Sequence, residues 1–404
     1  MILSRHDSVA SSLPLQALLI AVGRAVKSAV KLFLVAASPR RGFRSAALRH
    51  CLSGLACVLL TALLSGCQTV SYYRQAIAGE SVILLRRQSI PKLIADPKTP
   101  ALLKAKLQTI VQIRQFAADQ LLLPPGQSYL KYTDLRRSSV VWNVNIAPPL
   151  SLEPMTWWFP VVGRAGYRGF FHEQPARRYA GAFAKNGWDV YVDGVPTYST
   201  LGWFDDPILN TFIDEPDSYL AEIIFHELAH RRLFVPGDTD FNEAWATAVA
   251  SEGVRRWLLA TASPQAVDRY HANTVKDHQI VDLVMSARGQ LQDLYANTNL
   301  PDTVRLSRKQ DIIAQLRASH SELKASWGGQ SPYDGWFAEP INNAKLNTIS
   351  AYYDLVPAFD ALLRANGGEL EKFYNAVAQL AKLPFPERHR QLQSYLSHAP
   401  QQHS

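Results

Sequence analysis

The segment at residues 221–230 reads AEIIFHELAH and places a glutamate between two histidines. On a helix, His226 and His230 lie four residues apart and project from one face, so both imidazoles can reach one metal ion. Glu227 is rotated by about 100° around the helix axis, which directs it past the ion and toward a water bound there. This H-E-x-x-H spacing predicts a Zn²⁺ site in which Glu227 is the general base.

A catalytic zinc usually has three protein ligands and one open position, so a further ligand is expected nearby. Two glutamates follow, Glu243 and Glu252, in a helix expected at 241–260. Nine residues separate them, about 900° of rotation, so only one can face the metal. Glu243, in the first turn, is better placed to contact the preceding helix. Two alternatives stay open: Asp240 and Glu243 can form a capping box, and Thr247 is either a support for the ligands or an ordinary hydroxyl on a helix face.

The chain around these residues predicts the helices that must hold them. Pro216 and Asp217 stand where a helix start is expected, and Ile223, Ile224 and Leu228 give the zinc-binding helix an apolar side to bury. The segment PGDTD at 236–240 is long enough to reverse the chain before the second helix.

Upstream of this helix pair the periodicity is mixed. Helical spacing of apolar residues is followed by alternation typical of strands. The expected elements are a mostly helical stretch at 69–122 with a helix at 101–122, strands at 140–146, 155–162 and 187–192 (the last closed by Asp193-Gly194), and a short helix at 174–185. From Ser218 onward nearly everything is typical of helix. The prediction is an α+β fold with a small N-terminal sheet region, a zincin-type active-site helix pair and a mostly helical C-terminal body.

The net charge of +8 in 404 residues invites a nucleic-acid interpretation, but its distribution argues against one. Residues 1–66 hold eight Lys/Arg and one acid, which leaves 34 basic and 33 acidic residues in the rest of the chain. A nearly neutral body offers no electrostatic footprint for phosphates, so no nucleic-acid partner is expected.

The basic excess belongs to a segment typical of a secretory leader. Arginines precede an apolar run of 13 residues at 52–64, which is too short to span a bilayer comfortably. The run ends in Leu64-Ser65-Gly66-Cys67, which resembles the bacterial lipobox and implies that Cys67 carries the lipid that anchors the chain to a membrane. Bacterial lipoproteins with Asp after the lipidated cysteine typically stay in the inner membrane. Here Gln68 follows Cys67, so the resemblance implies the outer membrane, facing the periplasm. An uncleaved apolar anchor is the alternative.

No cysteine follows Cys67, so neither a disulfide nor a thiolate metal site is expected in the folded part. We divide the chain into a leader at 1–66, an N-terminal helical region at 67–135, a sheet with the zinc-binding helices at 136–260 and a helical C-terminal region at 261–404.

Three segments, at 187–209, 225–246 and 342–359, together with the lipobox, resemble a bacterial lipoprotein family of putative aminopeptidases. Asn242-Glu243 lies in a string similar to the N-E-x-x-A segment of gluzincin peptidases, which implies that Glu243 is the third ligand. Only twelve residues separate it from His230, fewer than in the best-known gluzincins. Aminopeptidases with this zinc motif usually carry a G-x-M-E-N segment that binds the free amino terminus of the substrate. No such segment is present in this sequence, so the resemblance supports peptidase action more strongly than exopeptidase action.

The same resemblance implies two further roles. A segment before the zinc helix, with Ser199, Thr200, Leu201 and Gly202, is expected to pair with the substrate backbone as an edge strand; the alternative is a structural turn. Tyr352 or Tyr353 is expected to donate a hydrogen bond to the tetrahedral intermediate; the alternative is core packing of a helix that bends at Pro357.

Three functions compete at this point. The first is zinc-dependent hydrolysis of a peptide substrate in the bacterial envelope. The second is a non-catalytic envelope lipoprotein that keeps the fold as a binding module, and the presence of Glu227 argues against it. The third is zinc-dependent hydrolysis of a non-protein envelope substrate.

Overall fold

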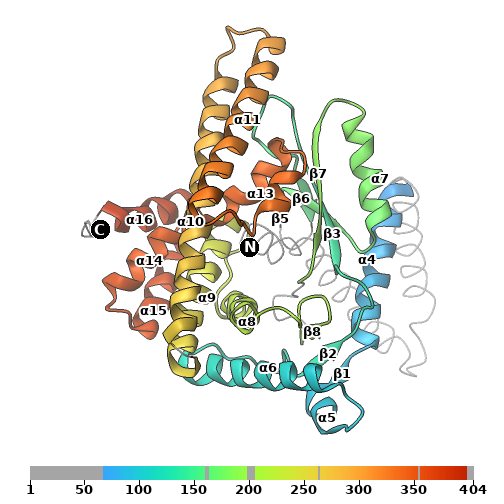
Figure 1. Cartoon of the computed structure of the whole chain (residues 1–404), viewed down its shortest axis with the longest axis vertical. Coiled ribbons are helices and arrows are strands. Elements are labelled where there is room, and N and C mark those ends of the chain that lie inside the picture. Colours follow the sequence, from blue (N-terminus) through green and yellow to red (C-terminus); the bar gives the residue numbers. More distant parts are fainter. Residues whose placement is uncertain (1–66, 160–162, 198–204, 263, 354, 398–404) are drawn as a thin grey trace, which may run out of the picture.

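A computed structural model describes residues 67–159, 163–197, 205–262, 264–353 and 355–397 of the chain. These residues are mostly helical, with sheets of two or three strands in the N-terminal half (Figure 1). The predicted α+β class is confirmed. None of the helices within these ranges is long and apolar enough to cross a membrane.

The described part begins with three helices, α4 (Cys67–Leu85), α5 (Ile90–Ala95) and α6 (Ala101–Gln120). In α6 the buried residues recur every three or four positions, as expected for a helix with one face against a core. They are Leu107, Ile110, Ile113 and Ala117. This confirms the helix predicted at 101–122, whose buried face packs against the helix of the H-E-x-x-H motif.

The larger sheet has strand order β6-β3-β7, with β3 (Val141–Ala147) antiparallel to β6 (Tyr167–Phe170) and to β7 (Asp189–Val195). Helix α7 (Glu173–Ala184) packs against β3 and β7, as Figure 1 shows. The predicted end of the last strand was wrong. Asp193 and Gly194 continue the ladder opposite Asn143 and Trp142, because the partner strand offers pairing that local turn propensity does not reveal.

Two smaller sheets complete the N-terminal half. One pairs β1 (Gln88–Ser89) with β2 (Lys131–Thr133) and β2 with β8 (Ile208–Leu209). The other pairs β4 (Trp157–Phe159) with β5 (Gly163–Ala165). The strand predicted at 155–162 is therefore observed in shorter form, and residues 160–162 lie outside the described ranges.

The helical body is built around α8 (Asp217–Arg232) and α9 (Thr239–Thr261). Helices α10 (Pro264–Ala296) and α11 (Asp302–Ser326) form a long hairpin, at the top of Figure 1, with its own hydrophobic cluster. The remaining helices are α12 (Asp334–Ala338), α13 (Asn343–Tyr353), α14 (Val356–Ala365), α15 (Leu370–Leu380) and α16 (Phe385–Ser397).

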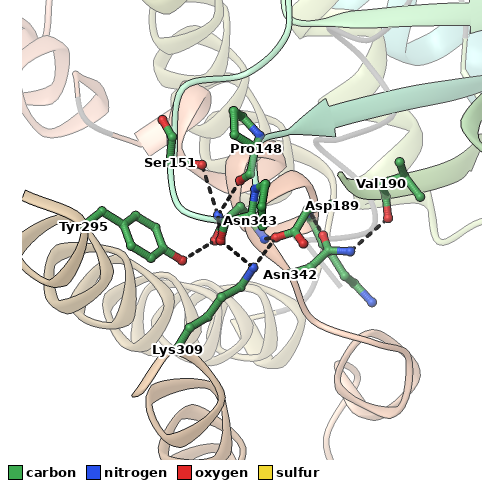
Figure 2. A network of polar contacts seen from close by, with 10 residues as sticks. Pro148, Ser151, Asp189, Val190, Tyr295, Lys309, Asn342 and Asn343 are labelled. Carbon is green, nitrogen blue, oxygen red and sulfur yellow. Dashed lines mark hydrogen bonds and ion pairs between the residues drawn. The ribbon is translucent and has the colours of Figure 1, made fainter. Parts of the chain in front are cut away.

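A polar network ties the start of α13 to the sheet and to the α10–α11 hairpin (Figure 2). The Asn343 side-chain amide donates hydrogen bonds to the carbonyls of Pro148, Pro149 and Ser151, and its oxygen accepts one from the Tyr295 hydroxyl. The Asn343 backbone N–H donates to Asp189 at 2.8 Å, and Lys309 forms an ion pair with the same carboxylate. Asn343 is completely buried, so these bonds fix where α13 begins.

Candidate metal centre

Helix α8 carries the H-E-x-x-H motif through the middle of the protein. It begins at Asp217 after Pro216, as predicted, and every residue from Tyr219 to His230 is buried. The sequence suggested one apolar side. The helix is instead enclosed all round, which explains why its polar residues need partners inside the fold.

Helices α8 and α9 pack closely and run antiparallel, because early residues of one contact late residues of the other. The Trp245 indole N–H, early in α9, donates to the Ala229 carbonyl near the end of α8 at 3.2 Å. Gly253, further along α9, lies against Phe225 in the middle of α8. A Cβ atom at Gly253 would lie 2.7 Å from a Phe225 ring carbon, so glycine permits this approach.

The beginning of α9 differs from the predicted capping box. Asp238, not Asp240, is the N-cap, and its carboxylate accepts a hydrogen bond from the Phe241 backbone N–H at 3.2 Å. Glu243 is therefore in the second turn, where it faces α8. The neighbouring Asn242 side chain forms two 2.8 Å hydrogen bonds with the backbone of Val235, which fixes the short connection between the helices.

The two histidines and Glu243 come together at a single buried point. The His226 Nε2 atom lies 3.1 Å from His230 Nε2 and 3.2 Å from Glu243 Oε2, and the His230 Nε2 to Glu243 Oε2 distance is 3.5 Å. The three residues are between 0% and 3% exposed and form a group that could hold a metal ion. The ligand set predicted from the sequence is thus assembled in space.

This triangle fits zinc in its dimensions and in its donor atoms. Zinc lies 2.0–2.1 Å from imidazole nitrogen, so two ligands of a tetrahedral ion are about 3.3–3.4 Å apart. The three observed separations bracket that value. Two imidazole nitrogens and a carboxylate oxygen also point toward one another here. A cation between them would stabilise this arrangement.

The electrostatics agree with a carboxylate that stays ionised. Burial alone would raise the pKa of Glu243, but the two imidazoles, His230 foremost, outweigh it and lower the pKa to about 2. Burial would lower the pKa of His230, but Glu243, with a smaller contribution from Glu227, raises it. An ionised glutamate is the form that binds a metal.

Glu252, the other glutamate of α9, does not join the cluster. Its carboxylate accepts hydrogen bonds from Arg255 and Arg256 at 2.7–2.8 Å. Of the two glutamates, only Glu243 lies beside His226 and His230.

Glu227 lies next to the ligands on a different side of α8. It is 4% exposed, and its negative charge raises the pKa of the buried Tyr129 phenol, after the larger effect of burial and together with Asp206. Arg231, one turn after Glu227, opposes this shift and donates a 3.1 Å hydrogen bond to the Pro125 carbonyl. Glu227 therefore lies near polar groups, Tyr129 and Arg231, that the sequence did not predict.

Tyr129, one of these polar groups, lies in a local turn. Tyr129 has a left-handed backbone with φ of 62°, and its N–H donates to the Asp206 carbonyl at 2.7 Å. The segment Pro124-Pro125-Gly126 leads into this turn. The only sequence signal that Arg231 lies near Glu227 is the spacing of four residues between them, which places both on one face of the helix.

Several predicted residues lie outside what the structure describes. The substrate-binding residues Ser199, Thr200, Leu201 and Gly202 fall in the undescribed range 198–204. Tyr352 and Tyr353 end α13 and Cys67 begins α4, but the side chains of these three residues are outside the described part. Helix α14 begins at Val356 with Pro357 in its first turn, so the chain starts a new helix there and does not bend an existing one.

Fold and site together define an α+β protein with a buried His-His-Glu ligand set on two antiparallel helices. Residues 71–392 match the model of the family described as "Putative aminopeptidase", and the chain therefore belongs to this family. The family supports a peptidase function and a peptide substrate. Comparisons with curated proteins and with solved structures found no match.

Proposed function

We propose that this protein is a zinc-dependent peptidase, and specifically an aminopeptidase, of the bacterial envelope. The observation that carries the proposal is the buried triangle of His226, His230 and Glu243, with separations suited to a tetrahedral zinc. Membership of the aminopeptidase family supports peptide bonds as the substrate.

The ligand residues would hold zinc, which when bound supplies Lewis acidity and a water that ionises near neutral pH. His226 and His230, whose Nε2 atoms meet 3.1 Å apart on one helix face, would hold the ion through these atoms. Glu243 adds a negative charge that offsets part of the ion's own. Burial of all three excludes bulk water and strengthens each electrostatic contact.

Glu227 would act as the general base. It adjoins His226 in sequence but projects from a different side of α8, toward the space that faces Tyr129 and Arg231. In that position it accepts the proton of the attacking water and delivers it to the amine that leaves. Tyr352 or Tyr353 would stabilise the oxyanion, and the segment 199–202 would pair with the peptide backbone.

The lipobox resemblance at Cys67 completes the proposal. Lipid on this cysteine would anchor the protein to a membrane, in the periplasm and on the outer membrane because Asp does not follow Cys67.

The test is hydrolysis of a peptide library by the full protein and by a Glu227→Gln variant, with bound zinc measured in both. We expect zinc in both proteins and hydrolysis slower by about 10²–10⁴-fold in the variant, because only the base is lost. A zinc-loaded wild type that cleaves no peptide, or a variant as active as the wild type, would contradict the proposal. The first result would favour the binding-module alternative.

A further inference from the structure

A cavity of about 660 Å³ lies between α6, α8, α9, α10 and α14. On α8 it is lined by Ser218 and Glu222, and on α9 by Thr247 and Ser251. Nothing in the proposed hydrolysis uses these residues.

The cavity begins one helical turn from the ligands along the contact between α8 and α9. Glu222 precedes His226 by four residues, and Thr247 follows Glu243 by four. Residues four apart share a face of a helix and are displaced by about 6 Å along its axis. A peptide with its reacting bond at the ligands could therefore extend one group into the cavity.

The cavity carries negative charge in its buried part. Glu222 is 8% exposed and Asp277, from α10, is 7% exposed, and both line it with the half-buried Asp360 of α14. Arg269 and Lys276 also line it. Both are more exposed than Glu222 and Asp277, and the Lys276 ammonium lies over the Trp327 ring, 5.3 Å from its centroid.

Tyr270 shows that the two buried carboxylates act on the same space. Burial raises the pKa of its phenol well above the ordinary value, and the charges of Glu222 and Asp277 raise it further. Hydrogen bonds that involve Ser251 and Thr274 work in the opposite direction. Tyr270 lines the cavity and is close enough to the carboxylates of both α8 and α10 to be affected by their charges.

An independent observation points to a missing ligand. Thr247 is only 4% exposed, and its hydroxyl has no hydrogen-bond partner among the described residues. A buried hydroxyl without a partner costs about 1–3 kcal/mol. Thr247 lines the cavity between the metal ligands and the buried carboxylates, so a polar group bound there would satisfy it.

We propose that this cavity binds a cationic group of the peptide, an ammonium or a guanidinium, through Glu222 and Asp277, with Thr247 as an additional hydrogen-bond partner. The inference rests on the proposed function, because it takes the peptide to be cut at the neighbouring ligands. The cation has two sources, the α-amino group of the substrate and the side chain of a lysine or arginine. The four-carbon stem of lysine is long enough to follow one helical turn.

Calorimetric titration of the zinc-loaded full protein with three small amides separates these sources. N-acetyl-lysinamide carries only the side-chain cation, norleucinamide carries only the α-amino cation on a stem of similar length, and N-acetyl-norleucinamide carries neither. We expect one or both of the cationic amides to bind at least about 10-fold more tightly than the neutral one. N-acetyl-lysinamide binding would assign the side chain as the source, and norleucinamide binding would assign the α-amino group.

Glu222→Gln and Asp277→Asn test the residues from two different helices, so failure of one variant to fold leaves the other. Each should weaken binding of the preferred amide by about 10-fold or more. Glu252→Gln removes the same charge from a residue of α9 that pairs with Arg255 and Arg256, and it should leave binding unchanged. Equal binding of all three amides, no binding of any, or full binding in both cavity variants would overturn the inference. Because titration needs no turnover, this result is independent of whether the protein hydrolyses peptides.

Discussion

Glu243 Oε2 lies 3.2 Å from His226 Nε2, across the contact between two helices and 17 residues apart in the chain. This distance depends on features outside the motif itself. Asp238 caps α9, Asn242 holds the turn before it, and Gly253 lets α9 approach the middle of α8 closely. The ligand geometry is therefore a property of the helix pair.

Gly253→Ala tests the close packing of that pair. The added Cβ would lie 2.7 Å from Phe225 and 2.8 Å from Leu121, so we expect overpacking to exceed the gain in helix propensity. The free energy of unfolding should fall by about 1–2 kcal/mol in denaturant titrations. Gly289→Ala is the matched control, because that exposed position in α10 has no atom within 4 Å of the added Cβ. It should stabilise by about 0.5–1 kcal/mol. Equal effects at both positions would show that packing against α8 is not what Gly253 provides.

Asn343→Ala tests the polar network of Figure 2. The change removes the donor to the carbonyls of Pro148 and Ser151 and one of the two donors to that of Pro149, which keeps Lys309. We expect a loss of about 2–4 kcal/mol in the free energy of unfolding. Asn342→Ala is the control. Its side chain donates only to the Val190 carbonyl and accepts from the Lys345 backbone N–H, so a loss of about 1 kcal/mol is expected. Chemical denaturation of both variants measures these two losses in the free energy of unfolding. A loss at Asn343 no greater than at Asn342 would contradict the network's proposed importance.

We expect the Asp360 carboxyl group to make the free energy of unfolding depend on pH. Burial, with a contribution from the charge of Glu252, raises its pKa to about 6 despite the nearby Arg364. The folded state therefore holds this proton more tightly than the unfolded state, and stability falls as pH rises from about 4 to about 6. We expect the wild type to lose about 1–3 kcal/mol relative to Asp360→Asn across that window and little beyond it. Denaturant unfolding of the metal-free proteins between pH 4 and pH 7 measures this difference. A difference that stays constant, or that grows in favour of the wild type, would refute the assignment.

The part of the site that depends on helical periodicity could be predicted from the sequence. His226, Glu227 and His230 follow from spacing within one helix, and the exclusion of Glu252 follows from rotation along another. The N-cap was misplaced by two residues because Asp238 and Asp240 are chemically alike, and only the fold shows that Asp238 also pairs with Arg388 and His389.

Contacts between distant segments could not be predicted. Tyr129 comes near Glu227 and Asp206 through a turn and a short parallel strand pair, and neither of these elements has a periodic pattern in the sequence. The same holds for Asn343, whose partners lie nearly 200 residues upstream. The cavity could not be predicted either, because Glu222 and Asp277 lie on different helices and only the packing of α8 and α10 brings them to one cavity.

The most direct test of the zinc site is the metal content of the full protein, measured by elemental analysis after equilibration with limiting zinc. Wild type and Glu252→Gln should each hold about one zinc per chain. Glu243→Ala should bind zinc at least about 100-fold more weakly, because it removes one of three protein ligands. A Glu243→Ala variant that binds zinc as tightly as the wild type would remove Glu243 from the ligand set. A folded wild type that binds no zinc would contradict the metal centre itself.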